Sequence, residues 1–300
     1  MDTVSSLSNH KESDDHASSS QAWIIFKDLL KHPLGATGFT ILLFVVMTAI
    51  FSPYLVSVDP VAVDFNAIQQ PPGSDYILGT DEIGRSMWSR IVYGSRVALK
   101  IILFSIGGAL IIGTTIGLIS GYAGGRVDMV IMRIMDGLLA FPPLVLALGI
   151  IAILGPDLIN ATIAIMVVNI PSFARLVRGA VLTVREQDYV LAIRALGASP
   201  FRIMRYHLLP NVVGNIIVFA SLRASTALIT EASLSFLGLG VQPPTPSWGY
   251  MIAIGMNYWD YWWMSFFPGL AIFITILGFN LFGDALRDVI DPHLRDSTRK

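Results

Sequence analysis

The chain has 300 residues, of which 54% are hydrophobic and 14% are charged, and its formal net charge is −1. A mean hydropathy of +0.65 is too apolar for a soluble chain of this length, so the lipid bilayer is the expected solvent and nucleic acid is not an expected partner. Cysteine is absent, which excludes a disulfide framework and a thiolate site.

The chain divides into four regions. Residues 1–22 are polar, rich in serine and lack the apolar core of a signal peptide, so we expect a disordered cytoplasmic tail. Residues 23–96 hold a first transmembrane helix and an outer segment, residues 97–290 a core transmembrane domain, and residues 291–300 a second cytoplasmic tail.

Six uncharged runs approach the length of about 20 residues that a helix needs to span a bilayer. Because a spanning segment must satisfy its own backbone hydrogen bonds, they predict an all-α membrane protein with six transmembrane helices. The runs are residues 35–56, 101–122, 137–154, 158–174, 212–230 and 262–282.

A further uncharged run, residues 232–259, is interrupted by glycines and by Pro243, Pro244 and Pro246. Proline inside a helix costs about 3 kcal/mol, so we expect a broken segment on the outer face instead of a seventh span. Gln242 and Ser247 are then predicted to be reachable from solvent. Tyr250 and the Tyr and Trp residues at 258–263 suit an aromatic belt at the outer interface, which we favour over a ligand-stacking site.

Lysine and arginine set the expected orientation. They occur near both chain ends and in residues 175–205, whereas residues 232–261 have none, which places both termini in the cytoplasm. Arg85, Arg90 and Arg96 are exceptions, because they fall in the loop between the first two spans, which this orientation places outside.

No sequence signature of catalysis is present. The chain lacks a phosphate-binding loop, a zinc-binding His-Glu-x-x-His helix and a Gly-x-Ser-x-Gly nucleophile motif. Uphill transport would therefore need an ion gradient or a separate ATPase. Arg223 is the one clear mid-span charge, and it could lie at a subunit interface, in a translocation path, or near a span end one turn away.

Residues 175–210 carry many arginines and predict a docking loop of two short helices. Thr183 and Glu186 have capping-box spacing, and Tyr189, Ile193 and Leu196 form an apolar stripe at helical spacing. The stripe could pack against a cytoplasmic protein, or lie on anionic lipid as basic amphipathic helices do.

The bend between the two short helices is predicted from three residues. Gly197 can adopt the left-handed conformation that ends a helix, Ser199 is a good N-cap, and Pro200 suits the first helical position. Arg202 and Arg205 are then expected on solvated flanks. Pro210 is expected to stop the second helix.

This stretch resembles the Glu-Ala-Ala…Gly…Ile-x-Leu-Pro loop of permease subunits of bacterial ABC importers. Ala192, Gly197, Leu209 and Pro210 match, whereas Leu191, Ile193 and His207 replace the family's Glu, second Ala and Ile. Because Leu191 replaces the family's Glu, any salt bridge made by that Glu is missing here, whereas the residues that form the bend are kept. The resemblance implies a coupling helix that contacts the ATPase through Tyr189, Ala192, Ile193, Leu196, Gly197, Ala198, Leu209 and Pro210.

Three further stretches, residues 78–90, 231–249 and 280–292, are similar to the second inner-membrane subunit of dipeptide and oligopeptide importers. The resemblance implies a homologous permease partner, two cytoplasmic subunits that bind ATP and Mg, a periplasmic solute-binding protein, and no cofactor in this chain. Gln242, Ser247 and Trp248 would then contact the binding protein on the outer side of the bacterial inner membrane. The alternatives are an ion-coupled carrier and a membrane receptor or anchor without transport activity.

Overall fold

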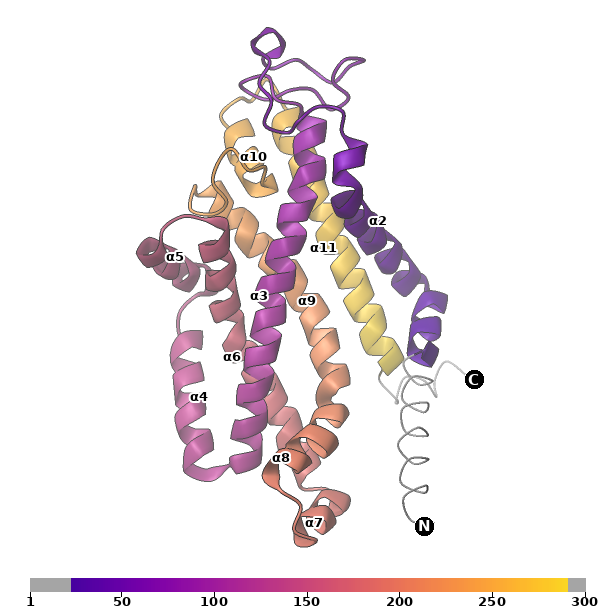
Figure 1. Ribbon diagram of the computed structural model, residues 1–300, viewed down its shortest axis with the longest axis vertical. Coiled ribbons are helices and arrows are strands. Elements are labelled where there is room, and N and C mark those ends of the chain that lie inside the picture. Colours follow the sequence, from indigo (N-terminus) through magenta and orange to yellow (C-terminus); the bar gives the residue numbers. More distant parts are fainter. Residues whose placement is uncertain (1–22, 291–300) are drawn as a thin grey trace, which may run out of the picture.

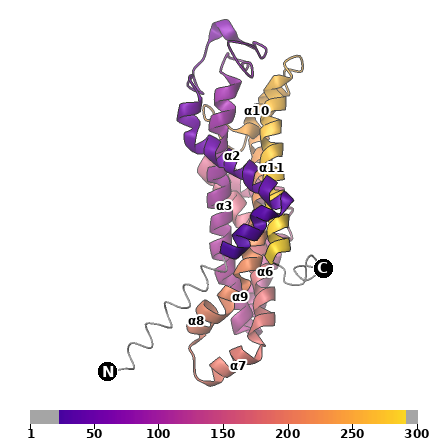
Figure 2. The same cartoon turned by 90° about the vertical axis from the view of Figure 1, so that its right-hand side faces the viewer.

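The computed structural model describes residues 23–290, and the tails predicted at 1–22 and 291–300 lie outside them. The described chain is an elongated helical bundle (Figures 1 and 2), and no strand is assigned in it. After a helical stretch at residues 23–31 come α2 (Pro33–Leu55), α3 (Met87–Ala123), α4 (Gly125–Leu139), α5 (Pro143–Leu154), α6 (Leu158–Arg185), α7 (Asp188–Ala195), α8 (Pro200–Ile203), α9 (Leu209–Phe236), α10 (Trp248–Gly255) and α11 (Trp263–Ile290).

Five helical segments within residues 23–290 are long and apolar enough to cross a membrane. They are α2, α3, α6, α11 and the continuous run Pro200–Phe236, and a sixth span results if α4 and α5 together make one. The predicted all-α membrane fold is confirmed. As predicted, α10 does not qualify as a span.

The expectation of one continuous helix at residues 137–154 is wrong. The chain bends by 89° between α4 and α5, at Pro142 and Pro143. Proline lacks an amide hydrogen and disfavours the helical conformation of the residue before it, so the pair ends α4 while Pro143 starts α5. Hydropathy identifies this run as apolar but does not detect the bend, which occurs at its two adjacent prolines.

Several helices also continue past the ends of their apolar runs. α6 extends to Arg185, well beyond the predicted end at residue 174, and α3 begins at Met87 instead of residue 101. Consequently, residues 175–185, predicted as part of a loop, belong to α6. Hydropathy shows which part of a helix is apolar. The helix itself can continue through charged residues, because its backbone hydrogen bonds do not require apolar side chains.

Glycines let the two central helices approach closely. Gly113, Gly117 and Gly121 lie four residues apart on the face of α3 that meets α6. A Cβ at Gly117 would lie 2.6 Å from the carbonyl oxygen of Ala174, and one at Gly121 would lie 2.8 Å from Val181. This repeat of small residues at every fourth position is a known packing device between membrane helices. The α3–α6 pair therefore forms the rigid centre of the bundle.

The bundle has two distinct ends. Residues 186–208, which we name the tip, contain α7 and α8 and extend beyond the ends of α2 and α11 (Figures 1 and 2). The opposite end carries the long segment 57–86 and α10 (Figure 1). A function that couples the two sides of a membrane would therefore have to connect these two ends of the bundle.

Candidate functional site

The tip begins with a short turn between α6 and α7. The predicted capping box is wrong, because Thr183 lies inside α6, where its hydroxyl donates to the Gly179 carbonyl at 3.5 Å. Glu186 is the C-cap of α6, and the N-cap of α7 is Gln187, whose side chain makes no capping hydrogen bond. The capping-box spacing occurred by chance within a longer helix.

The predicted bend at Gly197 is confirmed. Its φ of +83° lies in the left-handed region, where glycine alone among the residues pays little steric cost. The Gly197 amide donates to the Arg194 carbonyl at 3.0 Å and the Ala198 amide to the Ile193 carbonyl at 3.3 Å, the hydrogen-bond pattern of a Schellman cap. This geometry ends α7 and turns the chain toward α8.

The start of the second short helix is also as predicted, but its end is not. The Ser199 hydroxyl accepts a hydrogen bond from the Arg202 amide at 3.4 Å, and Pro200 occupies the first helical turn. The chain then continues through a π-helical turn, Met204–Leu208, into α9. Pro210 does not stop the helix: it lies in the first turn of α9, directly after the π-helical turn, and α9 continues to Phe236.

The apolar stripe of α7 is divided between the bundle and solvent. Val190, which was not predicted as a member, is 2% exposed and packs in the core together with Ile203 and Leu208. Ile193 packs partly against the same core, whereas Leu196 is 88% exposed. The tip is therefore anchored to the bundle mainly by Val190, Ile203 and Leu208, which are not members of the predicted stripe.

The outward face of the tip combines large apolar groups with arginines. Ala192, Gly197 and Pro210 are exposed, Ala198 and Leu209 are half-buried, and Tyr189 receives a hydrogen bond from Asn211 at 3.0 Å. We name the exposed set the coupling surface; it consists of Tyr189, Leu191, Leu196, Phe201 and Tyr206 with Arg194, Arg202 and Arg205.

An ionic brace behind the tip joins the adjacent helix ends, and sequence reasoning missed it. Arg178 of α6 donates two hydrogen bonds to Asp128 of α4, both at 2.6 Å, in the bidentate geometry typical of strong arginine–carboxylate pairs. Arg185 donates to the Gly121 carbonyl of α3 at 2.7 Å. These partners are far apart in sequence, so only the fold shows that they hold the base of the tip.

At the opposite end, two predicted contact residues are buried. Ser247 is 1% exposed and Trp248 is 4% exposed, so the expectation that Ser247 is reachable from solvent is wrong. The Ser247 hydroxyl donates to Glu231 Oε1 at 2.9 Å, and the Trp248 indole donates to the Ile91 carbonyl at 3.0 Å. Both side chains fasten residues 237–247 and α10 to the bundle. Gln242 is only partly covered.

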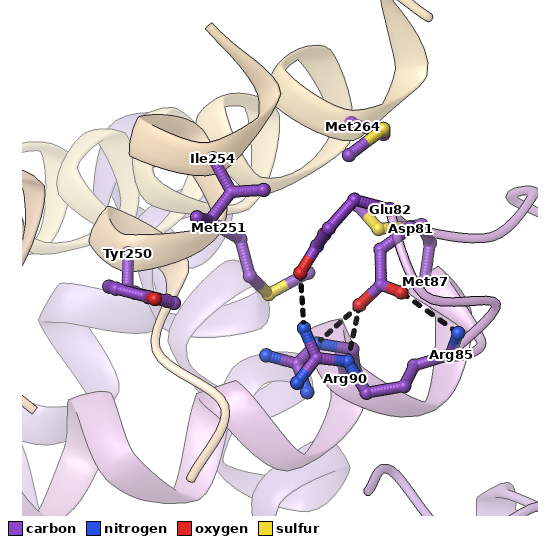
Figure 3. Close-up of a pocket in the computed structure, with 9 residues that line it drawn as sticks. All are labelled: Asp81, Glu82, Arg85, Met87, Arg90, Tyr250, Met251, Ile254 and Met264. Atoms are coloured by element: carbon purple, nitrogen blue, oxygen red, sulfur yellow. Dashed lines mark hydrogen bonds and ion pairs between the residues drawn. The ribbon is translucent and has the colours of Figure 1, made fainter. Parts of the chain in front are cut away.

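A buried ion cluster holds segment 57–86 on the start of α3 (Figure 3). Arg85 pairs with Asp81 at 2.6 Å and with Glu82 at 2.8 Å, and Arg90 lies 3.5 Å from Asp81. Burial, reinforced by the Asp81 carboxylate, raises the pKa of Glu82 above its ordinary value. The adjoining cavity of about 10 Å³ holds at most one water molecule, so the cluster is structural.

The cluster also explains two of the three charges that disagreed with the predicted orientation. Arg85 and Arg90 are neutralised by acidic neighbours, and they are 7% and 2% exposed. They therefore differ from the exposed arginines of the coupling surface.

The apolar helices define an all-α membrane protein, and comparison with known proteins gives its family. Residues 113–296 match the family described as binding-protein-dependent transport system inner membrane component, and residues 20–72 match the N-terminal TM domain of oligopeptide transport permease C. The chain belongs to this family of ABC importer permeases. It is thus a multi-pass inner-membrane transport component and not an enzyme.

Curated relatives match over most of their length. The dipeptide transport system permease protein of Alkalihalophilus pseudofirmus is 45% identical over 271 residues, 90% of this chain and 89% of the relative. The probable D,D-dipeptide transport system permease protein of Escherichia coli is also 45% identical, over 87% of this chain and 88% of the relative. The glutathione transport system permease protein of Pectobacterium atrosepticum is 42% identical, over 89% of each chain.

Among solved structures, an inward-facing form of the MetNI methionine ABC transporter matches with a TM-score of 0.58. The match covers 68% of this chain and 98% of that chain at 20% identity. It supports the fold alone.

Proposed function

We propose that this chain is one of two pore-forming permease subunits of an ATP-driven importer for dipeptides, longer peptides or related small solutes. The names of its relatives support this solute class, because they include dipeptide, D,D-dipeptide and glutathione permeases. A second, homologous permease would complete the pore. ATP and Mg would be held by two cytoplasmic ATPase subunits, and a periplasmic solute-binding protein would deliver the solute.

The coupling surface is the proposed docking site for an ATPase subunit. The observation that carries this assignment is a set of exposed apolar side chains on a tip that is itself anchored by buried Val190, Ile203 and Leu208. Leu196 at 88% and Phe201 at 71% exposure have no function in packing the bundle. Several large apolar side chains left exposed on one short segment mark an interaction site.

The position of the tip favours a protein partner over lipid. A helix lying on a bilayer stays near the level where the spans end, whereas α7 extends beyond the ends of α2, α3 and α11 (Figure 1). Closure of the ATPase subunits would move the tip. The glycine-packed α3–α6 pair, which Arg178 and Asp128 brace to α4, would transmit the movement as a rigid body.

The opposite end then faces the periplasm, with both termini in the cytoplasm. This orientation follows from the three exposed arginines of the tip and from the absence of Lys and Arg in residues 232–261. Gln242 remains a proposed contact for the solute-binding protein. Ser247 and Trp248 support that loop from behind.

The experiment is a co-purification of the chain with its ATPase subunits, comparing Leu196→Asp with wild type. Because Leu196 is exposed, the substitution should leave the bundle folded but place a charge in the docking contact, and recovery of the ATPase should fall. Leu237→Asp is the control, since Leu237 is 53% exposed in the turn at the opposite end. Equal recovery from both variants would contradict the docking assignment.

A further inference from the structure

Arg223 is an unpaired charge close to the middle of α9. Its guanidinium carbon lies 4.8 Å from the centre of the Phe219 ring, and none of its N–H groups has a hydrogen-bond acceptor among residues 23–290. A charge inside the hydrocarbon costs about 2.5–3.5 kcal/mol at mid-span on the translocon scale, so such residues usually face water or a partner. Packing within the chain does not explain this arginine.

A polar stripe continues from Arg223 along the same face of α9. Thr226, Thr230 and Ser233 follow at spacings of three, seven and ten residues, which helical periodicity places on one side. Each hydroxyl donates to a carbonyl of its own helix, at 2.8–2.9 Å. The hydroxyls therefore need no partner from another helix, yet all three side chains are at least partly exposed.

The stripe is turned away from the interior of the bundle. Other positions of α9 make the interior contacts: Ala224 and Leu228 are buried in a cluster shared with α3 and α11, and Ser225 donates to Asn280 of α11 at 2.8 Å. The stripe therefore occupies a face of α9 that the rest of this chain leaves open.

Phe219, which lies against Arg223, also contacts α6. Its ring packs edge-on against Phe173, with ring centres 5.0 Å apart. Arg175, two residues further along α6, projects to another side of that helix, where it pairs with Asp136 of α4 at 2.6 Å. This ion pair therefore does not belong to the face that α6 presents to Phe219.

We propose that the α9 stripe lines the translocation path and that Arg223 binds the carboxylate of the passing peptide. This inference rests on the proposed function, because every linear peptide with a free C-terminus carries such a group. The planar guanidinium can donate two parallel hydrogen bonds to a carboxylate. The hydroxyls of Thr226, Thr230 and Ser233 extend this water-exposed face of α9 toward the outer end of the bundle. An acidic residue of the second permease would explain Arg223 alone, but not a hydroxyl stripe that follows it for several turns.

The test uses single cysteines, which the chain naturally lacks. Thr226→Cys is compared with Phe104→Cys, which replaces a 62% exposed apolar side chain on α3, in the assembled transporter in lipid nanodiscs. Anionic and cationic thiosulfonate reagents of similar size report water access and the sign of the local field. We expect Thr226→Cys to react readily and Phe104→Cys hardly at all.

The anionic reagent should react faster at Thr226→Cys by about tenfold, as expected for a fixed charge roughly one turn away at intermediate dielectric. Adding Arg223→Gln should remove this preference, and Arg223→Lys should keep it. The inference would be overturned if Thr226→Cys were as unreactive as Phe104→Cys. It would also be overturned if the preference for the anionic reagent persisted in the Arg223→Gln variant. Loss of the second permease from the complex on Arg223→Gln would overturn it as well. Absence of peptide uptake by the wild-type complex would instead refute the proposed function, whatever the labelling shows.

Discussion

Replacing Gly197 by valine should uncouple the ATPase from transport without unfolding the bundle. Valine is β-branched, and the φ of +83° at this position is strongly unfavourable for it. Apart from its chain neighbours, no atom of residues 23–290 lies within 4 Å of an added Cβ, so the cost comes from the backbone conformation and not from a clash. That cost is about 1–3 kcal/mol for a residue held in a sparsely populated region.

This strain is comparable to what holds α7 in place. Full burial of a valine side chain such as Val190 contributes roughly 1.5–3 kcal/mol. The exposed hydrogen bond from Asn211 to Tyr189 adds about 0.5–1.5 kcal/mol at most. The turn can therefore relax by releasing α7, whereas the glycine-packed α3–α6 core is left intact.

The assay measures docking directly. Arg205→Cys is introduced alone and together with Gly197→Val, and the protection of its maleimide labelling by the ATPase subunits is measured alongside ATP-driven peptide uptake. The parent should be labelled freely and become protected on ATPase binding. In the Gly197→Val variant we expect protection and uptake to fall together, while membrane insertion is normal.

Gly238→Val is the matched control at the other end of the molecule. Gly238 has a φ of +76°, no atom within 4 Å of an added Cβ, and the same cap, with its own amide bonded to Ser235 and the next amide to Leu234. It should leave protection at residue 205 unchanged. Normal protection and uptake in the Gly197→Val variant would refute the reasoning, as would an equal loss of protection in both variants.

Two further predictions follow from packing and burial. Gly117→Leu should prevent assembly of a stable permease, because its Cβ would lie 2.6 Å from a backbone oxygen of α6. Gly107→Leu should be tolerated, because nothing in residues 23–290 lies within 4 Å of its added Cβ. Expression and thermal stability in detergent compare the two variants, and equal stability would contradict the close α3–α6 contact. Ser247→Cys should resist a membrane-impermeant maleimide added from the periplasmic side, and Gln242→Cys should react. The opposite pattern would mean that the loop is folded differently.

The sequence was most informative where local chemistry decides the structure. Gly197, Ser199 and Pro200 occupy the positions predicted for them, because a left-handed cap, a side-chain cap and a first-turn proline are determined by residues within a few positions of each other. Apolar runs likewise located the spans.

Long-range packing could not be read from the chain. The burial of Ser247 depends on Glu231, which lies on the preceding helix, and the Arg178–Asp128 brace joins different helices. Helix ends were also misjudged, because Pro210 is harmless in the first turn of α9 although it would break a helix interior. For the buried serine and the ionic brace, the missing information was the identity of the neighbouring helix.

The most direct test of the proposed function is reconstituted transport with one component left out at a time. Proteoliposomes that contain this chain, its permease partner and the ATPase subunits should take up a labelled dipeptide when the binding protein is outside and ATP is inside. Omitting this chain or any other component should abolish uptake, and an imposed ion gradient should not replace ATP. Uptake by this chain alone, driven by an ion gradient, would contradict the account.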